Sequence, residues 1–434
     1  MPLDGFASLF TPITPPVLAE EYWGKKPLLV RGRADKFDDL FDKQRLARAL
    51  KVAQSEAMLH HHLAPAVSVH ASFERGSKST PGKERVNILP SQYYEMLAAG
   101  ATVCIMGLES LDAELCDLAG RIKVELGYPG DVGFRSYHSI RDTGFSTHFD
   151  APSTASLQII GHKKWRYSRQ PAVDWPFDNG YYREYESPAR ATEPWRSLPL
   201  EEFEEVTLGP GDLLMLPAGT WHTADAIHEE TLGLTLSFGR ISPLKLIQEA
   251  LMARLSSDPK WRGMSLRPRP PGKLREAAYD PDFAALLREA AAQLHAMQEA
   301  PSALWNAWAR RTADRNLSLD RRPRRQPPGR PLATTRMTTN DRAPAAVLEE
   351  RTADGGRIVS VFLPNDPNAS ASARVELDDP DHIAWFEEVL RQGSFTAAES
   401  LAWRARGNMS EETVYDLLED LCAVGVLHFD GAAR

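Results

Sequence analysis

Short apolar runs separated by Gly, Pro and Asp turn residues dominate the chain from about residue 101 to residue 240. Runs of this kind are typical of strands in an antiparallel sandwich or barrel. One helix interrupts them at Ser110–Leu126, where apolar residues recur at helical spacing. The predicted strands are Ala101–Leu108, Gly133–Ile140, Thr154–Ile160, Lys164–Tyr167, Asp212–Leu216 and Thr231–Phe238.

Beyond residue 240 the apolar positions take a helical period. One stripe comprises Leu244, Ile247, Leu251 and Leu255, and a second Ala/Leu-rich stretch spans residues 281–297. An Arg/Pro-rich stretch at residues 310–336 is too polar and too often broken by proline to pack, so it predicts a linker. After it, strand and helix patterns alternate, ending in a helix capped by Ser410 and a strand at Val426–Phe429.

Composition narrows the class of protein. The chain has 434 residues with 42% hydrophobic and 25% charged residues, which indicates a globular protein of more than one domain. Neither a run of about 20 apolar residues nor a leader-like N-terminus is present, so a cytoplasmic protein is expected. The three cysteines are too few for a disulfide framework. A net charge of -8 argues against a generally basic nucleic-acid binder.

The segment Gly144–Asp150 ends in a His-Phe-Asp triplet. Side chains of a strand alternate faces, so His148 and Asp150 share one side while Phe149 points into a core. A third metal ligand is expected at His222, which opens a strand after two turns in residues 209–221. Two imidazoles and one carboxylate with open positions suit non-haem Fe(II) oxygenases. The sequence therefore predicts one Fe(II) ion at these ligands and no catalytic residue beyond them.

These motifs resemble the cupin-like JmjC oxygenase family, which uses Fe(II) and 2-oxoglutarate. The stretch Trp23–Val30 is similar to the family's N-terminal entry strand, and Leu157–Trp165 is similar to its hairpin with Gln, Gly, a basic residue and Trp. The C-terminal part resembles the winged-helix-like module of the ribosomal-protein hydroxylase branch, the ribosomal oxygenases. The resemblance covers residues 18–240 well and the C-terminus more loosely.

The resemblance implies a cosubstrate site as well as an iron site. The cosubstrates of the family are 2-oxoglutarate and O2. The distal carboxylate of 2-oxoglutarate needs a cation or hydroxyl in the pocket. Lys163 is the expected cation, because it follows Asp150 at the family's spacing. Where some members have a threonine before the first histidine, this chain has Phe145, so the hydroxyl partner must come from elsewhere. The candidates for this hydroxyl are Tyr137, Ser139, Thr154 and Ser237.

The resemblance and the patterns together predict a mainly β fold with helices. A double-stranded β-helix (cupin or jelly-roll) core is followed by a helical middle segment and a winged-helix-like α+β domain. The expected domains are 1–240 (JmjC/cupin-like, catalytic), 241–309 (helical, for dimerisation), 310–340 (Arg/Pro-rich linker) and 341–434 (winged-helix-like).

The favoured function is that of a dioxygenase that hydroxylates a protein or peptide side chain, with arginine or histidine of a ribosomal protein as the target by family analogy. Two alternatives stay open: a tailoring hydroxylase of a ribosomally made peptide, and a non-catalytic cupin-like binding module. Residues 381–434 hold ten acidic residues against four arginines, which argues against direct nucleic-acid binding and favours a basic partner.

The apolar helical stripe that begins at Leu244, together with Trp305 and Trp308, predicts a homodimer.

Overall fold

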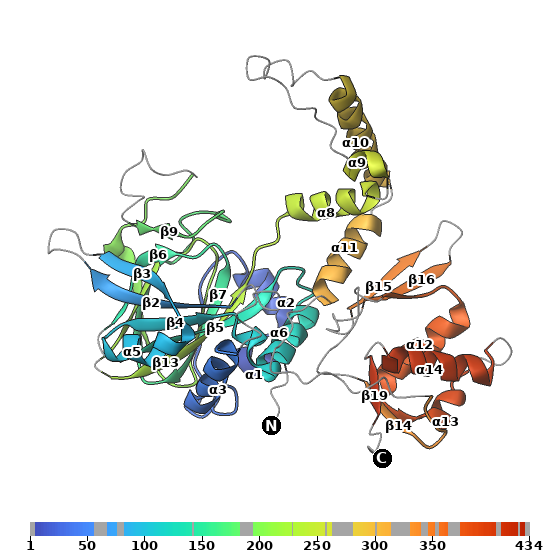
Figure 1. The fold of residues 1–434 in the computed structure, drawn as a ribbon, viewed down its shortest axis with the longest axis horizontal. Helices are drawn as coiled ribbons and strands as arrows, with labels where there is room; N and C mark the ends of the chain where they lie inside the picture. The colour runs from blue at the N-terminus through green and yellow to red at the C-terminus, as the bar shows by residue number, and fades with distance from the viewer. Residues whose placement is uncertain are drawn as a thin grey trace.

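The computed structural model describes most of the chain and shows a β barrel, a projecting helical arm and a C-terminal part (Figure 1). The described residues are 5–55, 67–75, 82–140, 143–182, 194–227, 229–256, 258–262, 281–299, 302–313, 330–339, 346–351, 356–362, 374–404, 409–423 and 426–429.

The larger sheet of the barrel has eight strands in the order β1-β11-β7-β13-β5-β4-β2-β3, and each neighbouring pair is antiparallel. The six strands predicted from the apolar runs are all present, five in this sheet and one, at Lys164–Tyr167, in the second sheet. The bounds are β1 (Leu28–Val30), β2 (Ser68–Arg75), β3 (Gly82–Ile88), β4 (Thr102–Met106), β5 (Val132–Ser139), β7 (Ser153–Ile160), β11 (Leu213–Leu216) and β13 (Thr231–Phe238).

The second sheet has five antiparallel strands in the order β10-β8-β12-β6-β9. Two antiparallel sheets built from strands interleaved along the chain form the predicted double-stranded β-helix, so this part of the fold prediction is confirmed. The bounds are β6 (Gly144–Phe149), β8 (Lys163–Tyr167), β9 (Gly180–Tyr181), β10 (Glu204–Leu208) and β12 (His222–Ala226).

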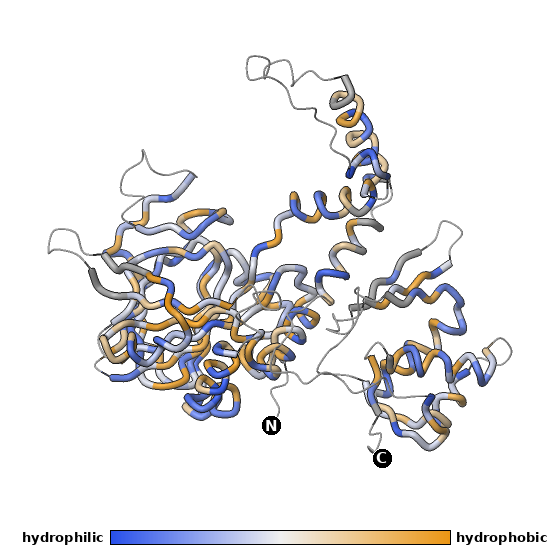
Figure 2. Tube along the Cα trace, in the orientation of Figure 1, coloured by the Kyte–Doolittle hydropathy of each residue, from blue (hydrophilic) through white to orange (hydrophobic). Residues whose placement is uncertain are grey.

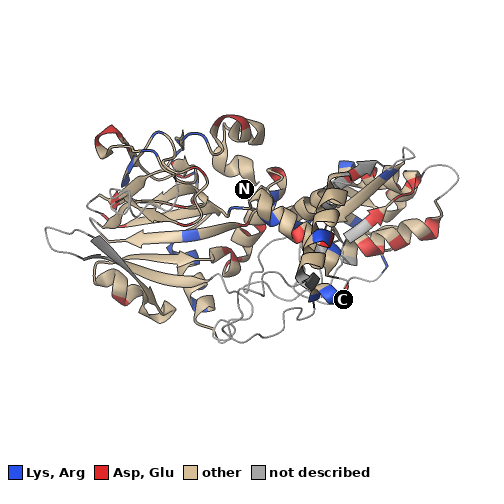
Figure 3. Cartoon of the chain, turned by 90° about the horizontal axis from the view of Figure 1, so that it is seen from above, with Lys and Arg blue, Asp and Glu red and all other residues tan. Residues whose placement is uncertain are grey.

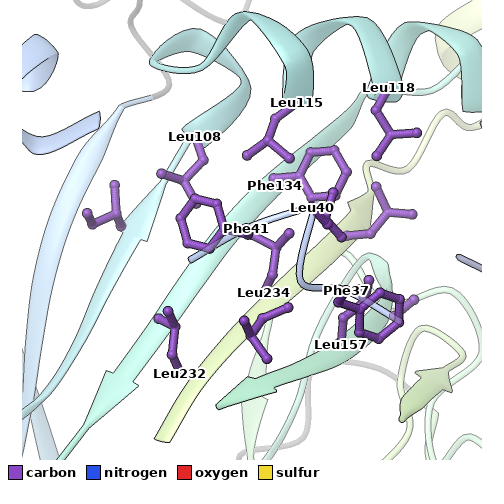
Figure 4. Close-up of a cluster of buried hydrophobic side chains, with 14 of the residues drawn as sticks. Phe37, Leu40, Phe41, Leu108, Leu115, Leu118, Phe134, Leu157, Leu232 and Leu234 are labelled. Atoms are coloured by element: carbon purple, nitrogen blue, oxygen red, sulfur yellow. The ribbon is translucent and has the colours of Figure 1, made fainter. Parts of the chain in front are cut away.

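Helices cover the outer face of the larger sheet. Figure 4 shows Leu115 and Leu118 of α6 against Phe134 and Leu234 of the strands, all of them fully buried. The carboxylate of Asp112 caps α6 by accepting from the Leu115 N–H at 3.1 Å. The covering elements are α1 (Phe6–Phe10), α2 (Pro15–Val17), η1 (Leu18–Tyr22), α3 (Lys43–Ala53), η2 (Pro90–Gln92), α5 (Tyr93–Ala98), η3 (Leu108–Ser110) and α6 (Ala113–Glu125), and η4 (Leu200–Glu202) precedes β10.

This packing decides what lines the barrel interior. Alternate residues of each strand face the helices, and these are apolar, such as Val103, Phe134 and Leu234. The intervening residues of the same strands therefore face the interior. They are mostly polar and include Thr102, Arg135, Tyr137, Ser139, Gln158, Thr235 and Ser237.

A helical arm follows the barrel and projects away from it (Figure 1). Trp308 ties it to the barrel by donating from Nε1 to the Gly127 carbonyl at 2.9 Å. Arg254 donates to Gln293 at 2.6 Å, which holds two of its helices together. The arm consists of α8 (Pro243–Leu255), α9 (Pro259–Arg262), α10 (Pro281–Glu299) and α11 (Ser302–Ala313).

The ends of the expected 310–340 linker lie in regular elements. Helix α11 continues through Ala313, and β14 (Arg336–Thr339) begins before residue 340. Arg311 lies within α11, and its guanidinium pairs with Glu249 of α8. Residues 314–329 of the segment lie outside the described part of the chain.

The C-terminal part has its own core, formed by Met337, Trp385, Phe386, Phe395, Leu418 and neighbouring apolar residues. Ser410 caps the last helix, as predicted, by accepting from the Thr413 N–H at 3.0 Å. Its two three-stranded sheets have the orders β18-β14-β19 and β15-β16-β17. The remaining bounds are β15 (Ala346–Arg351), β16 (Arg357–Phe362), β17 (Arg374–Leu377), α12 (Pro380–Gln392), β18 (Ser394–Thr396), α13 (Ala397–Leu401), α14 (Glu411–Ala423) and β19 (Leu427–Phe429).

The winged-helix arrangement stays a prediction. The central strand of the first C-terminal sheet, β14, comes before the helices in the chain, and β19 pairs with it rather than in a hairpin of its own.

Among the described residues, no helix is both long and apolar enough to cross a membrane.

Candidate metal centre

Strands β6 and β12 bring the three predicted ligands together. They pair antiparallel with His148 directly opposite His222, so both imidazoles project from the same face, with ring centroids 4.4 Å apart. Asp150 follows β6 directly. One ligand atom from each of the three residues lies within 4.8 Å of the others, close enough for all three to bind one ion.

The turn before His222 depends on a glycine. Gly219 has a φ of 77°, in the left-handed region that residues with a Cβ avoid, and a Cβ there would lie 1.9 Å from the Val173 carbonyl oxygen. The Gly219 N–H donates to the Asp150 carbonyl at 2.9 Å, so this turn is anchored beside the first two ligands. The chain therefore enters β12 at the position that delivers His222.

Both histidines are held in the tautomer that metal binding needs. His148 Nδ1 lies 2.7 Å from the Ser146 carbonyl oxygen, and His222 Nδ1 lies 2.9 Å from that of Thr220. A carbonyl only accepts, so each Nδ1 carries a hydrogen, and in the neutral imidazole the lone pair is then on Nε2. Burial, and then the neighbouring His148, lower the pKa of His222 to about 4 against the opposing effect of Asp150, which leaves this imidazole neutral at pH 7.

The carboxylate of Asp150 is oriented by an amide. Asn179 donates from Nδ2 to Asp150 Oδ1 at 2.8 Å, whereas Oδ2 lies 3.9 Å from His222 Nε2. The donor set is therefore two imidazole Nε2 atoms and one carboxylate oxygen on one side of the site. This set fits a single Fe(II) ion with open positions for other ligands.

Strand alternation separates the two lysines of β8. Lys163 is 4% exposed and points into the barrel, where its Nζ lies 5.7 Å from the centroid of the Tyr137 ring. Lys164 points outward and pairs with Glu205 at 2.7 Å. Lys163 is thus the lysine of this hairpin that can meet a ligand inside the barrel.

Small side chains follow His222 on the inner face of β12. Ala224 and Ala226 alternate with outward residues, and in the register of the sheet Ala226 lies opposite Lys163. No bulky side chain of β12 therefore stands between His222 and the level of Lys163. This arrangement suits an elongated diacid that binds the metal at one end and the lysine at the other.

The four hydroxyl candidates have different surroundings. Tyr137 lines the pocket at the metal ligands, and burial raises the pKa of its phenol, which stays a hydrogen-bond donor at neutral pH. Ser237 accepts from Arg135 Nη2 at 2.8 Å, and Thr154 lies opposite Ser237 in the sheet register. Ser139 bonds to Thr102 at 2.9 Å. Among the described residues lining the pocket, Tyr137 is the one member of this set, and the Lys163 Nζ lies over its ring.

Arg135 is a pocket residue that the sequence reasoning missed. It lines the pocket, and its Nη1 lies 3.5 Å from the Tyr137 hydroxyl. Burial acts to lower the pKa of Arg135, but Tyr137 and Asp150 outweigh it, so the pKa stays above its ordinary value and the charge is permanent. Its spacing could have revealed it, because Arg135 shares a strand face with Tyr137 two residues later. The lining also includes Thr102, Cys104, Phe145, Asn179 and Tyr181 beside His148 and Asp150.

Comparison with known proteins identifies the domain that holds this site. Residues 125–245, which include all three candidate ligands, match the JmjC domain family. The chain is 28% identical over 271 residues to the uncharacterized protein YxbC of Bacillus subtilis, covering 60% of this chain and 78% of that protein. It is 25% identical to ribosomal oxygenase 1 of chicken, covering 59% of this chain and 41% of the relative, which is less than half its length.

A solved structure extends the similarity to nearly the whole fold. The ribosomal oxygenase YcfD of Escherichia coli, crystallised with cobalt and 2-oxoglutarate, aligns with a TM-score of 0.52 at 17% identity, covering 97% of this chain and 99% of that one. At this identity the match establishes a shared fold. The resemblance predicted from the sequence, to JmjC oxygenases of the ribosomal oxygenase branch, is confirmed.

Proposed function

We propose that this protein is a 2-oxoglutarate- and Fe(II)-dependent oxygenase that hydroxylates a side chain of a protein. The observation that carries the proposal is the cluster of His148, Asp150 and His222 inside a JmjC domain. A non-catalytic binding module would have no need of two histidines fixed with both Nε2 atoms ready for a metal.

Each residue then has a defined task. His148, Asp150 and His222 hold the iron, and Lys163 pairs with the distal carboxylate of 2-oxoglutarate, with Tyr137 as the nearest hydroxyl candidate. Once bound, iron, O2 and 2-oxoglutarate supply the oxidation of a C–H bond, with succinate and CO2 as co-products. The partly buried Arg135 adds positive charge beside the site, which favours the dianionic cosubstrate.

The favoured substrate is an arginine or histidine side chain of a ribosomal protein. Support comes from the chicken relative, which is named as a ribosomal oxygenase. Exposed acidic residues on α14, including Glu411, Glu412, Asp416 and Asp420, would attract a basic polypeptide. Figure 3 shows acidic residues in red on helices of the C-terminal part. The same charge disfavours direct contact with nucleic acid.

Turnover with ribosomal proteins tests the proposal. Purified protein with Fe(II), 2-oxoglutarate and a mixture of ribosomal proteins should produce succinate, and mass spectrometry should find one added oxygen on a single ribosomal protein. Boiled enzyme gives the background. Succinate without an oxidised ribosomal protein would favour a peptide-tailoring enzyme, and metal binding without any succinate would favour a binding module.

We further propose a homodimer formed through the helical arm. Several large apolar side chains of the arm are exposed, including Leu244 (74%) and Trp305 (55%), and Figure 2 shows hydrophobic positions along α8 and α10. A surface of this kind is commonly buried against a second copy. Part of the predicted stripe packs within the chain, because Leu255 is 9% exposed and Trp308 bonds to Gly127. The interface is therefore centred on Leu244 and Trp305.

Charged substitutions in the arm should produce a monomer. Light scattering at micromolar concentration should give a dimer mass for the wild-type protein and a monomer mass for Leu244→Glu combined with Trp305→Glu, because burying the two carboxylates is costly. Leu332→Glu is a matched control, since Leu332 is 73% exposed but lies outside the arm. A monomeric wild-type protein, or a dimer that persists in the double variant, would contradict this interface.

A further inference from the structure

A single exposed side chain connects the carboxylate ligand to the loop before β9. Asn179 donates from Nδ2 to Asp150 Oδ1 at 2.8 Å and accepts at its own Oδ1 from the Ala151 N–H, also at 2.8 Å. The backbone N–H can only donate, which fixes the amide orientation and turns the NH2 group toward the carboxylate. Asn179 thus forms hydrogen bonds with both the candidate ligand and the residue after it.

The three ligands differ in how they are oriented. His148 and His222 are each held by a carbonyl two residues earlier in the chain, so their orientation is local. Asp150 lies beyond the end of β6 and is oriented by a side chain 29 positions away. The bond from Asn179 holds Oδ1, and Oδ2 then lies on the side of His222.

The position of Asn179 is itself well supported. The next residues form β9, where Gly180 pairs with Phe149 and Tyr181 pairs with His148. On the other side of the loop, Val173 is buried with Phe149 and Trp221. The loop is also held by Arg240, which donates to the Trp175 carbonyl at 3.0 Å. An exposed asparagine is therefore held against the metal centre by backbone anchors on both sides.

We propose that Asn179 is a positioning residue for the metal centre: it holds Asp150 so that Oδ2 faces the site shared with His148 and His222. The inference rests on the proposed iron site and adds a residue that does not touch the metal. It explains why an exposed loop side chain makes both of its hydrogen bonds to the segment that carries a ligand. Removing the amide would take away the hydrogen bond that holds Oδ1.

Metal titration separates this role from a purely structural one. Co(II) is titrated into metal-free protein and followed by its visible absorption, so the readout does not require turnover. Asn179→Ala should weaken Co(II) binding by roughly 10–100-fold and alter the Co(II) spectrum, as loss of an outer-shell partner typically does. Asp178→Ala changes the exposed neighbour and leaves both hydrogen bonds of Asn179 in place. This control variant should bind Co(II) as the wild-type protein does.

The outcomes are distinct. Wild-type affinity and an unchanged spectrum in Asn179→Ala would overturn the inference, as would an equal loss in Asp178→Ala, because any change in this loop would then have the same effect. Thermal unfolding of the metal-free variants checks folding, and Asn179→Ser carries the same expectation should the alanine variant fail to fold. A wild-type protein that binds no Co(II) would refute the metal centre itself, and the inference with it.

Discussion

Replacing His222 by alanine should abolish turnover and weaken metal binding by more than the roughly 10–100-fold that loss of an outer-shell partner costs. The variant loses one of three protein ligands, and the two that remain come from β6 and its C-terminal end, on one side of the site. The next inward residues of β12 are Ala224 and Ala226, which carry no ligand atom that could replace the Nε2 of His222.

Co(II) titration and succinate formation, measured on the same preparation, check this expectation. His162→Ala is the control. His162 lies exposed on the hairpin between β7 and β8, and its side chain bonds to Glu229. That variant should match the wild-type protein in both measurements. Near wild-type activity of His222→Ala in a metal-replete assay would show that His222 is not a ligand.

Replacing Lys163 by alanine should raise the Michaelis constant for 2-oxoglutarate by on the order of a hundredfold or more while leaving metal affinity nearly unchanged. Lys163 is 4% exposed, so its ammonium meets the distal carboxylate in a largely dry environment. Removing one partner of a buried ion pair costs about 3–5 kcal/mol, because the other charge stays buried without compensation.

The neighbouring lysine provides the control. Lys164→Ala removes the same charge from the next residue of β8, but that side chain is exposed and paired with Glu205. Its effect on 2-oxoglutarate should be small, since exposed pairs contribute about 0–1 kcal/mol. An unchanged Michaelis constant in Lys163→Ala, together with a raised one in Arg135→Met, would assign the carboxylate to Arg135.

Much of the site could be predicted because side chains along a strand alternate between its two faces. His148 and Asp150 lie two residues apart, and the alternation that places them on one side also separates Lys163 from Lys164. The same alternation puts Arg135 and Tyr137, two residues apart, on the interior face of β5.

Other features depend on contacts between distant parts of the chain. The register that sets His222 opposite His148 arises from the closure of the barrel, which no local pattern specifies. Asn179 lies in a loop without periodicity, so its bond to Asp150 could be found only from the folded chain. In the helical arm, the stripe of leucines was correct as a helix face, but packing decided that Leu255 is buried and Leu244 exposed.

Local sequence patterns are enough to establish the periods of the strands and helices, the types of ligand and the spacing of His148 and Asp150, because side-chain direction along a strand follows from local backbone geometry. The folded chain is needed to show which oxygen of Asp150 is held, that Arg135 shares the pocket, and which arm residues stay exposed. Those properties depend on strand register and on loops packed between elements, which are set by the free energy of the whole barrel rather than by any one segment.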